Sequence, residues 1–357
     1  MAIPANYLIV GGAGFIGSHF VDKLLSLPET KKVTVLDNFS SGSRVHLKAH
    51  QNNSRLSIQE GDAADLPTLE IAMQQAEAVI HLASNPDLAK AQFDPDIDFR
   101  QGTILTRNIL EAMRKTNTTY LLYASGSGVY GDCGTQKLRE NYGPLLPISP
   151  YGASKLAGEA LISSYCHMFG IRAIAFRFAN VIGPRQTHGV GFDFLRRLRQ
   201  YSQELLILGD GRQSKPYIDV TDVIEAVWLA FSKSQKIFDV FNISTEEALT
   251  VLEIAQMACA TLNLSRETTQ LRFSGGQTGW KGDVPIVRLD STKIRSLGWR
   301  PKFTSQEAMR RALIALRDEG QNPDATPQVN QSFLRTNDST DGRKSPQNAS
   351  LHESLEP

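Results

Sequence analysis

Tyr151 and Lys155 lie four residues apart, a spacing that places two side chains on one face of a helix. A phenol is a poor base at neutral pH, but a neighbouring ammonium and a bound cationic cofactor both favour the phenolate. The pair could then take a proton from a substrate hydroxyl while a hydride leaves the same carbon. The alternative is an aromatic residue and a lysine on a solvated helix face, and the motifs upstream argue against it.

A glycine-rich loop lies between the strand-like run Tyr7–Val10 and the helix-like run Ser18–Ser26. Its spacing, G-x-x-G-x-x-G, allows a tight turn, lets the backbone approach a pyrophosphate and brings the helix close to the strand. A glycine triplet alone is a weak signal, but this one follows a strand and opens a helix, as a dinucleotide-binding motif requires. The predicted cofactor contacts in this loop are Gly11, Gly14, Phe15, Ile16 and Gly17.

An acidic residue, Asp37, ends the second strand-like run. A carboxylate at this place accepts hydrogen bonds from an adenosine ribose and repels a 2′-phosphate, which favours NAD over NADP. Arg44 lies close enough in sequence to weaken that distinction, and Asp37 with Asn38 could instead only begin a turn. Asp62 follows the third strand-like run, where it could meet the adenine or cap a helix. The other predicted cofactor contacts are Asn38, Asp62, Leu82 and Ala83, together with Tyr151 and Lys155.

The elements that must position these residues are short, nearly all-apolar runs that alternate with longer amphipathic stretches. Such runs are typical of strands covered on both faces, and their alternation with helices predicts βαβ units in a parallel sheet. The predicted fold class is α/β, a doubly wound parallel sheet. The predicted strands are Tyr7–Val10, Lys32–Leu36, Leu56–Gln59, Ala78–Leu82, Tyr120–Ala124, Arg172–Phe178, Leu205–Leu208 and Phe238–Ile243. The predicted helices are Ser18–Ser26, Ile104–Arg114, Gly152–Phe169, Phe192–Tyr201, Val220–Phe231 and Leu249–Leu262.

The composition limits the classes of partner. Of the 357 residues 41% are hydrophobic, enough for a sizeable core, and a net charge of +1 gives no electrostatic case for a nucleic-acid polymer or a membrane surface. The three cysteines are far apart, so neither a disulfide framework nor a metal site is expected. No targeting segment is visible, nor an apolar run near the ~18 residues that span a bilayer, which favours a cytoplasmic protein. Residues 320–357 are polar and predict a disordered tail.

A series of motifs follows in one order along the chain: Val10–Gly17, Val33–Asn38, Val79–Ala83, Asn108–Met113, Val129–Gly131, Ser149–Glu159, Asn180–Pro184, Gly209–Asp222 and Gly282–Pro301. This order resembles the extended short-chain dehydrogenase/reductase superfamily, and within it the NAD-dependent nucleotide-sugar epimerases and dehydratases of the UDP-glucose 4-epimerase type. The resemblance implies bound NAD and a Rossmann domain over residues 1–183, to which 217–245 returns. It also implies a substrate domain formed by 184–216 and 246–317, and a homodimer formed by helices like 104–114 and 152–169.

The chain departs from this family at a hydroxyl that members carry three residues before Val129–Gly131. That position is Gly126, flanked by Ser125 and Ser127. We expect Ser125 to share the transferred proton, with Ser127 as the second choice and a turn or capping role as the alternative. Dehydratases of the family continue with an Asp-Glu pair, whereas Ser127 and Gly128 stand here, which argues against a 4,6-dehydratase.

Further departures concern the expected substrate contacts. Gly102 stands where the family usually has Asn, and Lys215 and Trp280 stand where it has arginines. Lys215 can still bind phosphate, as a point charge without a bidentate fork, and Lys281 or Arg212 could compensate for Trp280. The resemblance implies substrate contacts at Asn180, Arg185, Phe192, Lys215 and Lys281. Arg185 could equally be a charged residue of a loop without a substrate contact, and Phe192 could equally be an aromatic residue of the core.

The predicted function is that of a nucleotide-sugar 4-epimerase that works through a transient 4-keto sugar, with tightly held NAD and Tyr151 as the base. The alternatives are a nucleotide-sugar dehydratase or decarboxylase, a reductase of the same superfamily and, from another class, a non-catalytic NAD-binding regulator. The intact pair of Tyr151 and Lys155 argues against the regulator, whereas Gly126 and Gly102 mildly favour it.

Overall fold

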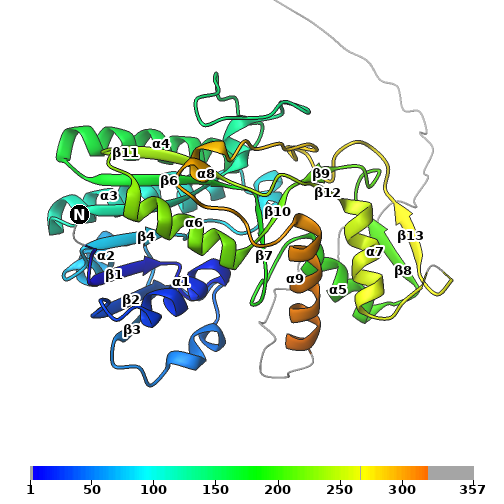
Figure 1. Cartoon of the computed structure of the whole chain (residues 1–357), viewed down its shortest axis with the longest axis horizontal. Coiled ribbons are helices and arrows are strands. Elements are labelled where there is room, and N and C mark those ends of the chain that lie inside the picture. Colours follow the sequence, from blue (N-terminus) through cyan, green and yellow to red (C-terminus); the bar gives the residue numbers. More distant parts are fainter. Residues whose placement is uncertain (1–2, 266, 321–357) are drawn as a thin grey trace, which may run out of the picture.

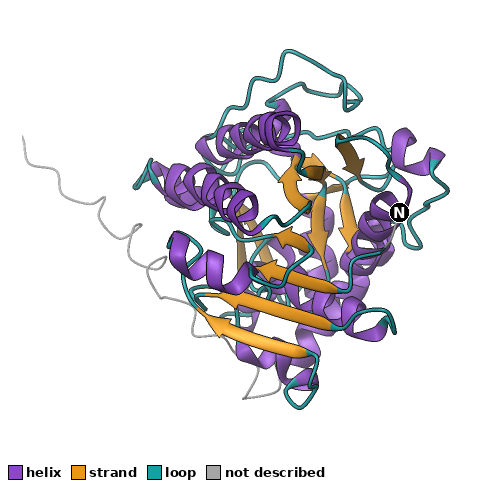
Figure 2. Cartoon of the chain, turned by 90° about the vertical axis from the view of Figure 1, so that its left-hand side faces the viewer, coloured by secondary structure: helices purple, strands orange, loops and turns teal. Residues whose placement is uncertain are grey.

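The computed structural model describes residues 3–265 and 267–320, and its centre is a parallel sheet of seven strands. The strands run in the order β11-β6-β5-β4-β1-β2-β3, with helices on both faces (Figure 1 and Figure 2). Every neighbouring pair is parallel, which confirms the predicted α/β fold class. The strands are β1 (Asn6–Val10), β2 (Lys32–Asp37), β3 (Leu56–Glu60), β4 (Ala78–His81), β5 (Tyr120–Gly126), β6 (Arg172–Phe178) and β11 (Phe238–Ile243). The predicted tail lies outside the described residues, apart from Gly320.

Two groups of helices bury the two faces of the sheet. One face packs against α1 (Phe15–Ser26) and α6 (Val220–Lys233), and the other against α2 (Leu66–Met73), α3 (Leu105–Thr116) and α4 (Pro150–Phe169). Because successive strand residues point to opposite faces, Tyr123 of β5 packs on the side of α3 and α4, and Leu122 packs on the side of α1. Ser125 has the same parity as Tyr123, so its side chain faces α4.

Local capping sets where two of the helices begin. Pro150 occupies the first turn of α4, and the Ser149 hydroxyl accepts the Gly152 N–H at 3.1 Å, so the helix starts before the predicted Gly152. The predicted helix Leu249–Leu262 is wrong at its start. Leu249 and Thr250 form the strand β12, which pairs with Lys215 and Ser214, and α7 (Val251–Thr261) begins after a capping box.

A smaller group of elements lies at the other end of the molecule (Figure 1). Its helices α5 (Val190–Gln200), α7 and α9 (Ser305–Glu319) pack around a separate core. The remaining strands are β7 (Asn180–Ile182), β8 (Glu204–Ile207), β9 (Ser214–Lys215), β10 (Tyr217–Asp219), β12 (Leu249–Thr250) and β13 (Gln270–Phe273). The short helical segments are η1 (Arg44–His50), η2 (Leu88–Gln92), η3 (Phe99–Ile104), η4 (Ser127–Tyr130) and α8 (Thr292–Ser296). β11 follows these elements in the chain but pairs with β6, so the central sheet is built from separate stretches of chain. The predicted domain boundaries agree with this order and stay a proposal.

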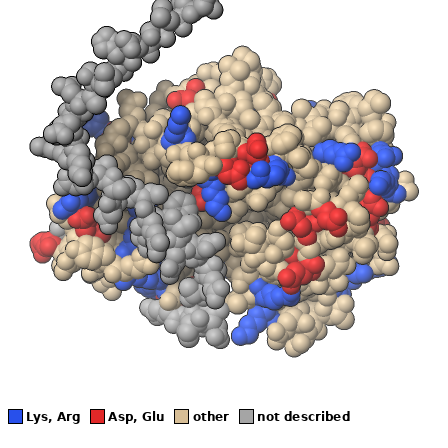
Figure 3. All heavy atoms as spheres, turned by 180° about the vertical axis from the view of Figure 1, so that it is seen from behind, with Lys and Arg blue, Asp and Glu red and all other residues tan. Residues whose placement is uncertain are grey.

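Charges of both signs lie side by side on the surface. On the face shown in Figure 3, lysine and arginine side chains neighbour aspartate and glutamate side chains. Within residues 3–265 and 267–320, no helix combines the length and the apolar character needed to cross a membrane.

A buried polar triad fixes α4 against the sheet. The Ser125 hydroxyl of β5 donates to Glu159 Oε1 at 2.6 Å, and Arg177 of β6 donates to the same carboxylate through Nε at 3.0 Å and Nη2 at 2.7 Å. All three side chains are buried. Since one carboxylate of α4 bridges two strands, the helix is held in a single position on the sheet, and Tyr151 and Lys155 with it.

We expect Arg177→Met to lower the free energy of unfolding by about 3–5 kcal/mol, because it leaves the Glu159 charge buried without its partner. Urea denaturation measures the change. Arg272→Met, which breaks the exposed ion pair with Glu204, is the matched control and should change stability far less. Equal losses in the two variants would contradict a stabilising role for the buried pair.

Candidate active site

The glycine loop joins β1 to α1 with very close backbone contacts. Gly11 has a φ of +83°, and a Cβ at this residue would lie 2.8 Å from the Ala83 amide nitrogen. A Cβ at Gly17 would lie 2.3 Å from the Gly11 carbonyl oxygen. Gly14 is the N-cap of α1 without a side-chain cap, and the first turn has no acidic residue. The first-turn N–H groups, including those of Phe15 and Ile16, are therefore open to an anion, and this cradle fits the pyrophosphate of a dinucleotide.

Asp37 lies beside the loop at the end of β2. Its Oδ2 accepts the Ala13 N–H and its Oδ1 accepts the Phe39 N–H, each at 2.9 Å. Burial raises the pKa of Asp37, and these two hydrogen bonds oppose that change. A carboxylate so held keeps lone pairs for the hydroxyls of a ribose. Arg44 forms an ion pair with Glu60, so its charge is engaged there.

Asn38 and Asp62 stand next to each other at the ends of β2 and β3. Asn38 Nδ2 donates to Asp62 Oδ2 at 3.4 Å, and Asp62 Oδ1 accepts the Ala64 N–H at 2.8 Å. The N-cap of α2 is Asp65, so Asp62 belongs to the turn that precedes the helix.

Lys155 is 3% exposed, so it does not lie on a solvated helix face. Its ammonium donates to the Ala124 carbonyl of β5 at 2.9 Å and lies 5.4 Å from the centre of the Tyr151 ring. Burial lowers the pKa of Lys155 to about 8, and the negative charge of Asp98 acts in the opposite direction. The amine is therefore mostly protonated at pH 7 and loses its charge as the pH rises through about 8.

Tyr151 is held as a neutral phenol in the protein alone. Burial raises the pKa of Tyr151 to about 12; a hydrogen bond with the Ser84 side chain lowers it, and the charge of Asp98 raises it further. The phenolate therefore needs further positive charge, which a cationic nicotinamide supplies.

The two serines predicted to share the transferred proton, Ser125 and Ser127, differ in their surroundings. The Ser125 hydroxyl is bonded to Glu159, whereas Ser127 begins η4 and is half-buried. Gly126 lies between them, and a Cβ there would have no atom within 4 Å. Both serines remain predictions as reacting hydroxyls. Sequence reasoning missed Ser84, whose one signal was its place directly after Ala83.

Sequence reasoning also missed a buried carboxylate near the pair. Asp98 is 1% exposed; its Oδ1 accepts from Asn85 Nδ2 at 3.0 Å, and its Oδ2 has no partner within the described ranges. It precedes η3, the turn that carries Gly102. A Cβ at Gly102 would lie 2.6 Å from the Ser154 hydroxyl, so the missing side chain lets this turn approach α4.

Several predicted substrate contacts come together across distant segments. Lys215 of β9 forms an ion pair with Asp283 at 2.6 Å and lies 5.4 Å from the centre of a Trp280 ring. Asn180 begins β7 near Pro216, whose carbonyl accepts its N–H at 3.2 Å. Among the other predicted contacts, Lys281 is exposed and Phe192 packs at the edge of the core formed by α5, α7 and α9.

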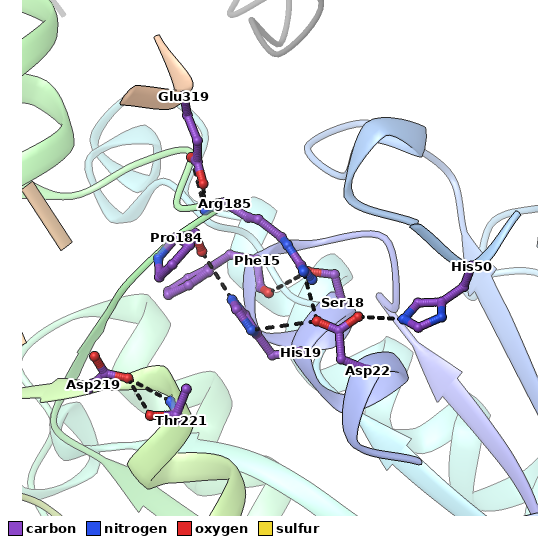
Figure 4. A network of polar contacts seen from close by, with 10 residues as sticks. All are labelled: Phe15, Ser18, His19, Asp22, His50, Pro184, Arg185, Asp219, Thr221 and Glu319. Carbon is purple, nitrogen blue, oxygen red and sulfur yellow. Dashed lines mark hydrogen bonds and ion pairs between the residues drawn. The ribbon is translucent and has the colours of Figure 1, made fainter. Parts of the chain in front are cut away.

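Arg185 is directed to α1 (Figure 4). Its Nη2 pairs with Asp22 at 2.7 Å, and its N–H donates to Glu319 of α9 at 3.0 Å. The same Asp22 lies 2.7 Å from His50 Nε2, and His19 Nε2 lies 3.1 Å from the Pro184 carbonyl oxygen. Because this network joins α1 to α9, it supports an interdomain contact at Arg185, and a substrate contact there stays a prediction.

Known proteins resemble this chain over most of its length. The model of the NAD-dependent epimerase/dehydratase family matches residues 7–244. A UDP-glucose 4-epimerase of Mycolicibacterium smegmatis is 30% identical over 328 residues, which cover 88% of this chain and 99% of the relative. The crystal structure of a UDP-galactose 4-epimerase is 36% identical with a TM-score of 0.78, covering 88% of this chain and 99% of that chain. A dTDP-glucose 4,6-dehydratase double mutant from Streptomyces venezuelae, crystallised with NAD, is 25% identical with a TM-score of 0.81. The match covers 90% of this chain and 99% of that chain.

Two alanine substitutions in the glycine loop should weaken NAD binding for different reasons. Gly17→Ala forces a Cβ against the Gly11 carbonyl, so we expect a lower melting temperature together with loss of NAD. Gly14→Ala meets that carbonyl only at 3.3 Å, so the fold should persist while the added methyl hinders the pyrophosphate. The NAD content of the purified variants and their melting temperatures measure both effects. Full NAD content in Gly17→Ala would contradict this placement of the cofactor.

Proposed function

Because the chain belongs to the NAD-dependent epimerase/dehydratase family, we propose that it is a nucleotide-sugar 4-epimerase. NAD is its cofactor. The observation that carries the proposal is the placement of Tyr151 beside the buried ammonium of Lys155, at the carboxyl ends of the strands that also carry the glycine loop. This pair suits oxidation of a sugar hydroxyl, a step that a protein which only binds the cofactor does not perform.

In this proposal Tyr151, as the phenolate, removes the proton from the C4 hydroxyl of the sugar. The glycine loop and Asp37 would hold NAD, which would supply hydride transfer from C4 of the sugar and back to it. Lys155 holds positive charge beside the phenolate and is itself fixed by the Ala124 carbonyl. After the 4-keto sugar has turned within the site, Tyr151 returns the proton to the C4 oxygen, which leaves the other epimer and no net redox change.

The residues around Gly126 support an epimerase over a dehydratase. A dehydratase must also remove a C5 proton and expel a hydroxyl, which requires additional acid–base groups. Ser127 and Gly128 occupy the two positions where dehydratases of the family carry a carboxylic acid pair, so no carboxylate is available at those positions.

The substrate contacts and the assembly are part of the same proposal. Lys215, Lys281 and Asn180 would bind the nucleotide and sugar, with Lys215 shared between the diphosphate and Asp283. We further propose a cytoplasmic homodimer formed through α3 and α4. Met168 and Phe169, at the end of α4, are 74% and 49% exposed, which supports a covered surface there. Light scattering of the purified protein tests this assembly, and a monomer would exclude it.

The proposed reaction is tested with a panel of UDP-, GDP-, CDP- and dTDP-sugars, in which NMR detects new anomeric signals. We expect one of them to be converted without a change of mass or of NADH absorbance. Loss of water or carbon dioxide would indicate a dehydratase or decarboxylase, and net NADH change a reductase. Tyr151→Phe should reduce turnover by at least about 100-fold while NAD stays bound, because the base is lost. The control Tyr201→Phe removes an exposed hydroxyl and should be silent; turnover near wild type in Tyr151→Phe would overturn the mechanism.

A second variant tests the phosphate contact. Lys215→Met should raise the KM for the nucleotide sugar about 10- to 100-fold and change kcat much less, because a charge-assisted hydrogen bond to the substrate is lost. Lys215→Arg keeps the charge and should recover most of the affinity. Melting temperatures check that the unpaired Asp283 has not unfolded either variant. An unchanged KM in Lys215→Met would exclude Lys215 from the substrate site.

A further inference from the structure

The ammonium of Lys155 lies between two aromatic rings. It is 5.3 Å from the centre of the Tyr123 ring and 5.4 Å from the centre of the Tyr151 ring. We propose that Tyr123 is a positioning residue for Lys155, whose ring face holds the ammonium at the Ala124 carbonyl and keeps it charged. The inference deepens the proposed function and rests on it, because Lys155 is the charge beside the reacting phenol. Tyr123 acts through Lys155 and is assigned no contact with the substrate.

The contact between Lys155 and Tyr123 is of the kind that gains strength from burial. The face of an aromatic ring is electron-rich and attracts a cation within about 6 Å of the ring centre, most strongly where the cation has lost its hydration shell. Lys155 is 3% exposed and Tyr123 is 1% exposed, so water does not screen this pair. The ring therefore offsets part of the desolvation that burial imposes on the ammonium.

Two successive residues of β5 contact the same ammonium. Lys155 Nζ donates to the Ala124 carbonyl oxygen at 2.9 Å, and the Tyr123 ring approaches it from the neighbouring position of the strand. An ammonium has three N–H donors on a flexible stem, and the bond to Ala124 fixes only one of them. A ring face beside that bond restricts the remaining motion of the stem. Carbonyl and ring together set the place of the charge relative to Tyr151.

The Tyr123 ring is itself fixed from two sides. On β4, His81 is its partner in the sheet register, and the two ring centres are 5.2 Å apart. On α4, a Cβ at Gly158 would clash with the Tyr123 hydroxyl oxygen. Gly158 follows Lys155 by three residues, about one helical turn, so the absence of its side chain lets this part of the helix lie directly on the ring.

The other titratable groups around Lys155 differ in their effect. Burial lowers the pKa of Lys155 to about 8, and the charge of Asp98 raises it. Burial holds the pKa of His81 well below its usual value, so this imidazole is neutral at pH 7. Glu159, one turn further along α4, is paired within the buried triad. Since the Tyr123 ring favours the ammonium, weakening that ring should lower the pKa of Lys155, and the charge would be lost at a lower pH.

The experiment changes the electron density of the ring while keeping its shape. Tyr123→Phe is compared with Tyr123 replaced by phenylalanines that carry two or three ring fluorines, which withdraw electrons from the face. With lysines labelled at 13Cε, NMR follows the titration of Lys155 in the NAD-loaded protein, and Lys155→Met identifies its signal. We expect Tyr123→Phe to leave the pKa of Lys155 nearly unchanged. The pKa should then fall stepwise with fluorination, by about one unit in total.

Tyr120 supplies the matched control on the same strand. Its ring lies 5.7 Å from that of Phe231, on the opposite face of the sheet, so the same fluorinated series there should leave the Lys155 titration unchanged. A Lys155 pKa that stays constant across the Tyr123 series would overturn the inference, because a ring that only fills space is insensitive to its electron density. An equal fall in the Tyr120 series would overturn it too.

Turnover provides a second readout. If Lys155 must be charged, activity is lost as the pH rises through its pKa, so fluorination at Tyr123 should move the alkaline limb of the kcat profile to lower pH by the same step. The KM for the nucleotide sugar should change much less. If the wild type converts no nucleotide sugar, the proposed function fails, whereas the titration still tests the contact between Tyr123 and Lys155.

Discussion

The site depends on one hydrogen bond, from the ammonium of Lys155 to the carbonyl of Ala124. A charge buried this deeply is tolerated only where it has hydrogen-bond acceptors and opposite charge nearby. The bond requires the first turns of α4 to lie directly on the end of β5. The triad of Ser125, Glu159 and Arg177 secures the same contact one turn further along the helix. The contact between α4 and β5 therefore supports both the stability of the fold and the geometry of the proposed catalytic pair.

The electrostatics of the pair follow from this burial. A low-dielectric site disfavours both the ammonium of Lys155 and the phenolate of Tyr151. Burial therefore lowers the pKa of Lys155 to about 8 and raises the pKa of Tyr151 to about 12. Asp98 supports the ammonium but opposes the phenolate. Tyr151 is thus a neutral phenol in the protein alone, and in the proposed mechanism the positive charge of bound NAD would favour the phenolate. The proposed mechanism therefore links the reactivity of Tyr151 to the binding of NAD.

The sequence was sufficient for the features that local spacing encodes. The all-apolar runs predicted the strands of the sheet, and the loop from Gly11 to Gly17 predicted the cofactor cradle. It was insufficient where a residue acquires its meaning from a distant partner. The sequence around Asp98 does not predict that Asn85 and Lys155 are its neighbours. The sequence around Arg185 likewise does not predict its contacts with Asp22 and Glu319. Parallel strands bring such partners together only through the crossovers between them, so their contacts depend on the whole topology.

The departures from the family pattern are best understood together with the elements that face them. At Gly102 the missing side chain is required, because a Cβ would lie 2.6 Å from the Ser154 hydroxyl on α4. At Gly126 it is only absent, since nothing lies within 4 Å of a Cβ there. The first glycine therefore reflects packing between two elements, whereas the second leaves room that the chemistry can use. A glycine at an expected functional position is thus no sign by itself of a lost activity. What decides is whether the reacting pair itself is in place, and Lys155 is held on the end of β5 with the Tyr151 ring beside its ammonium.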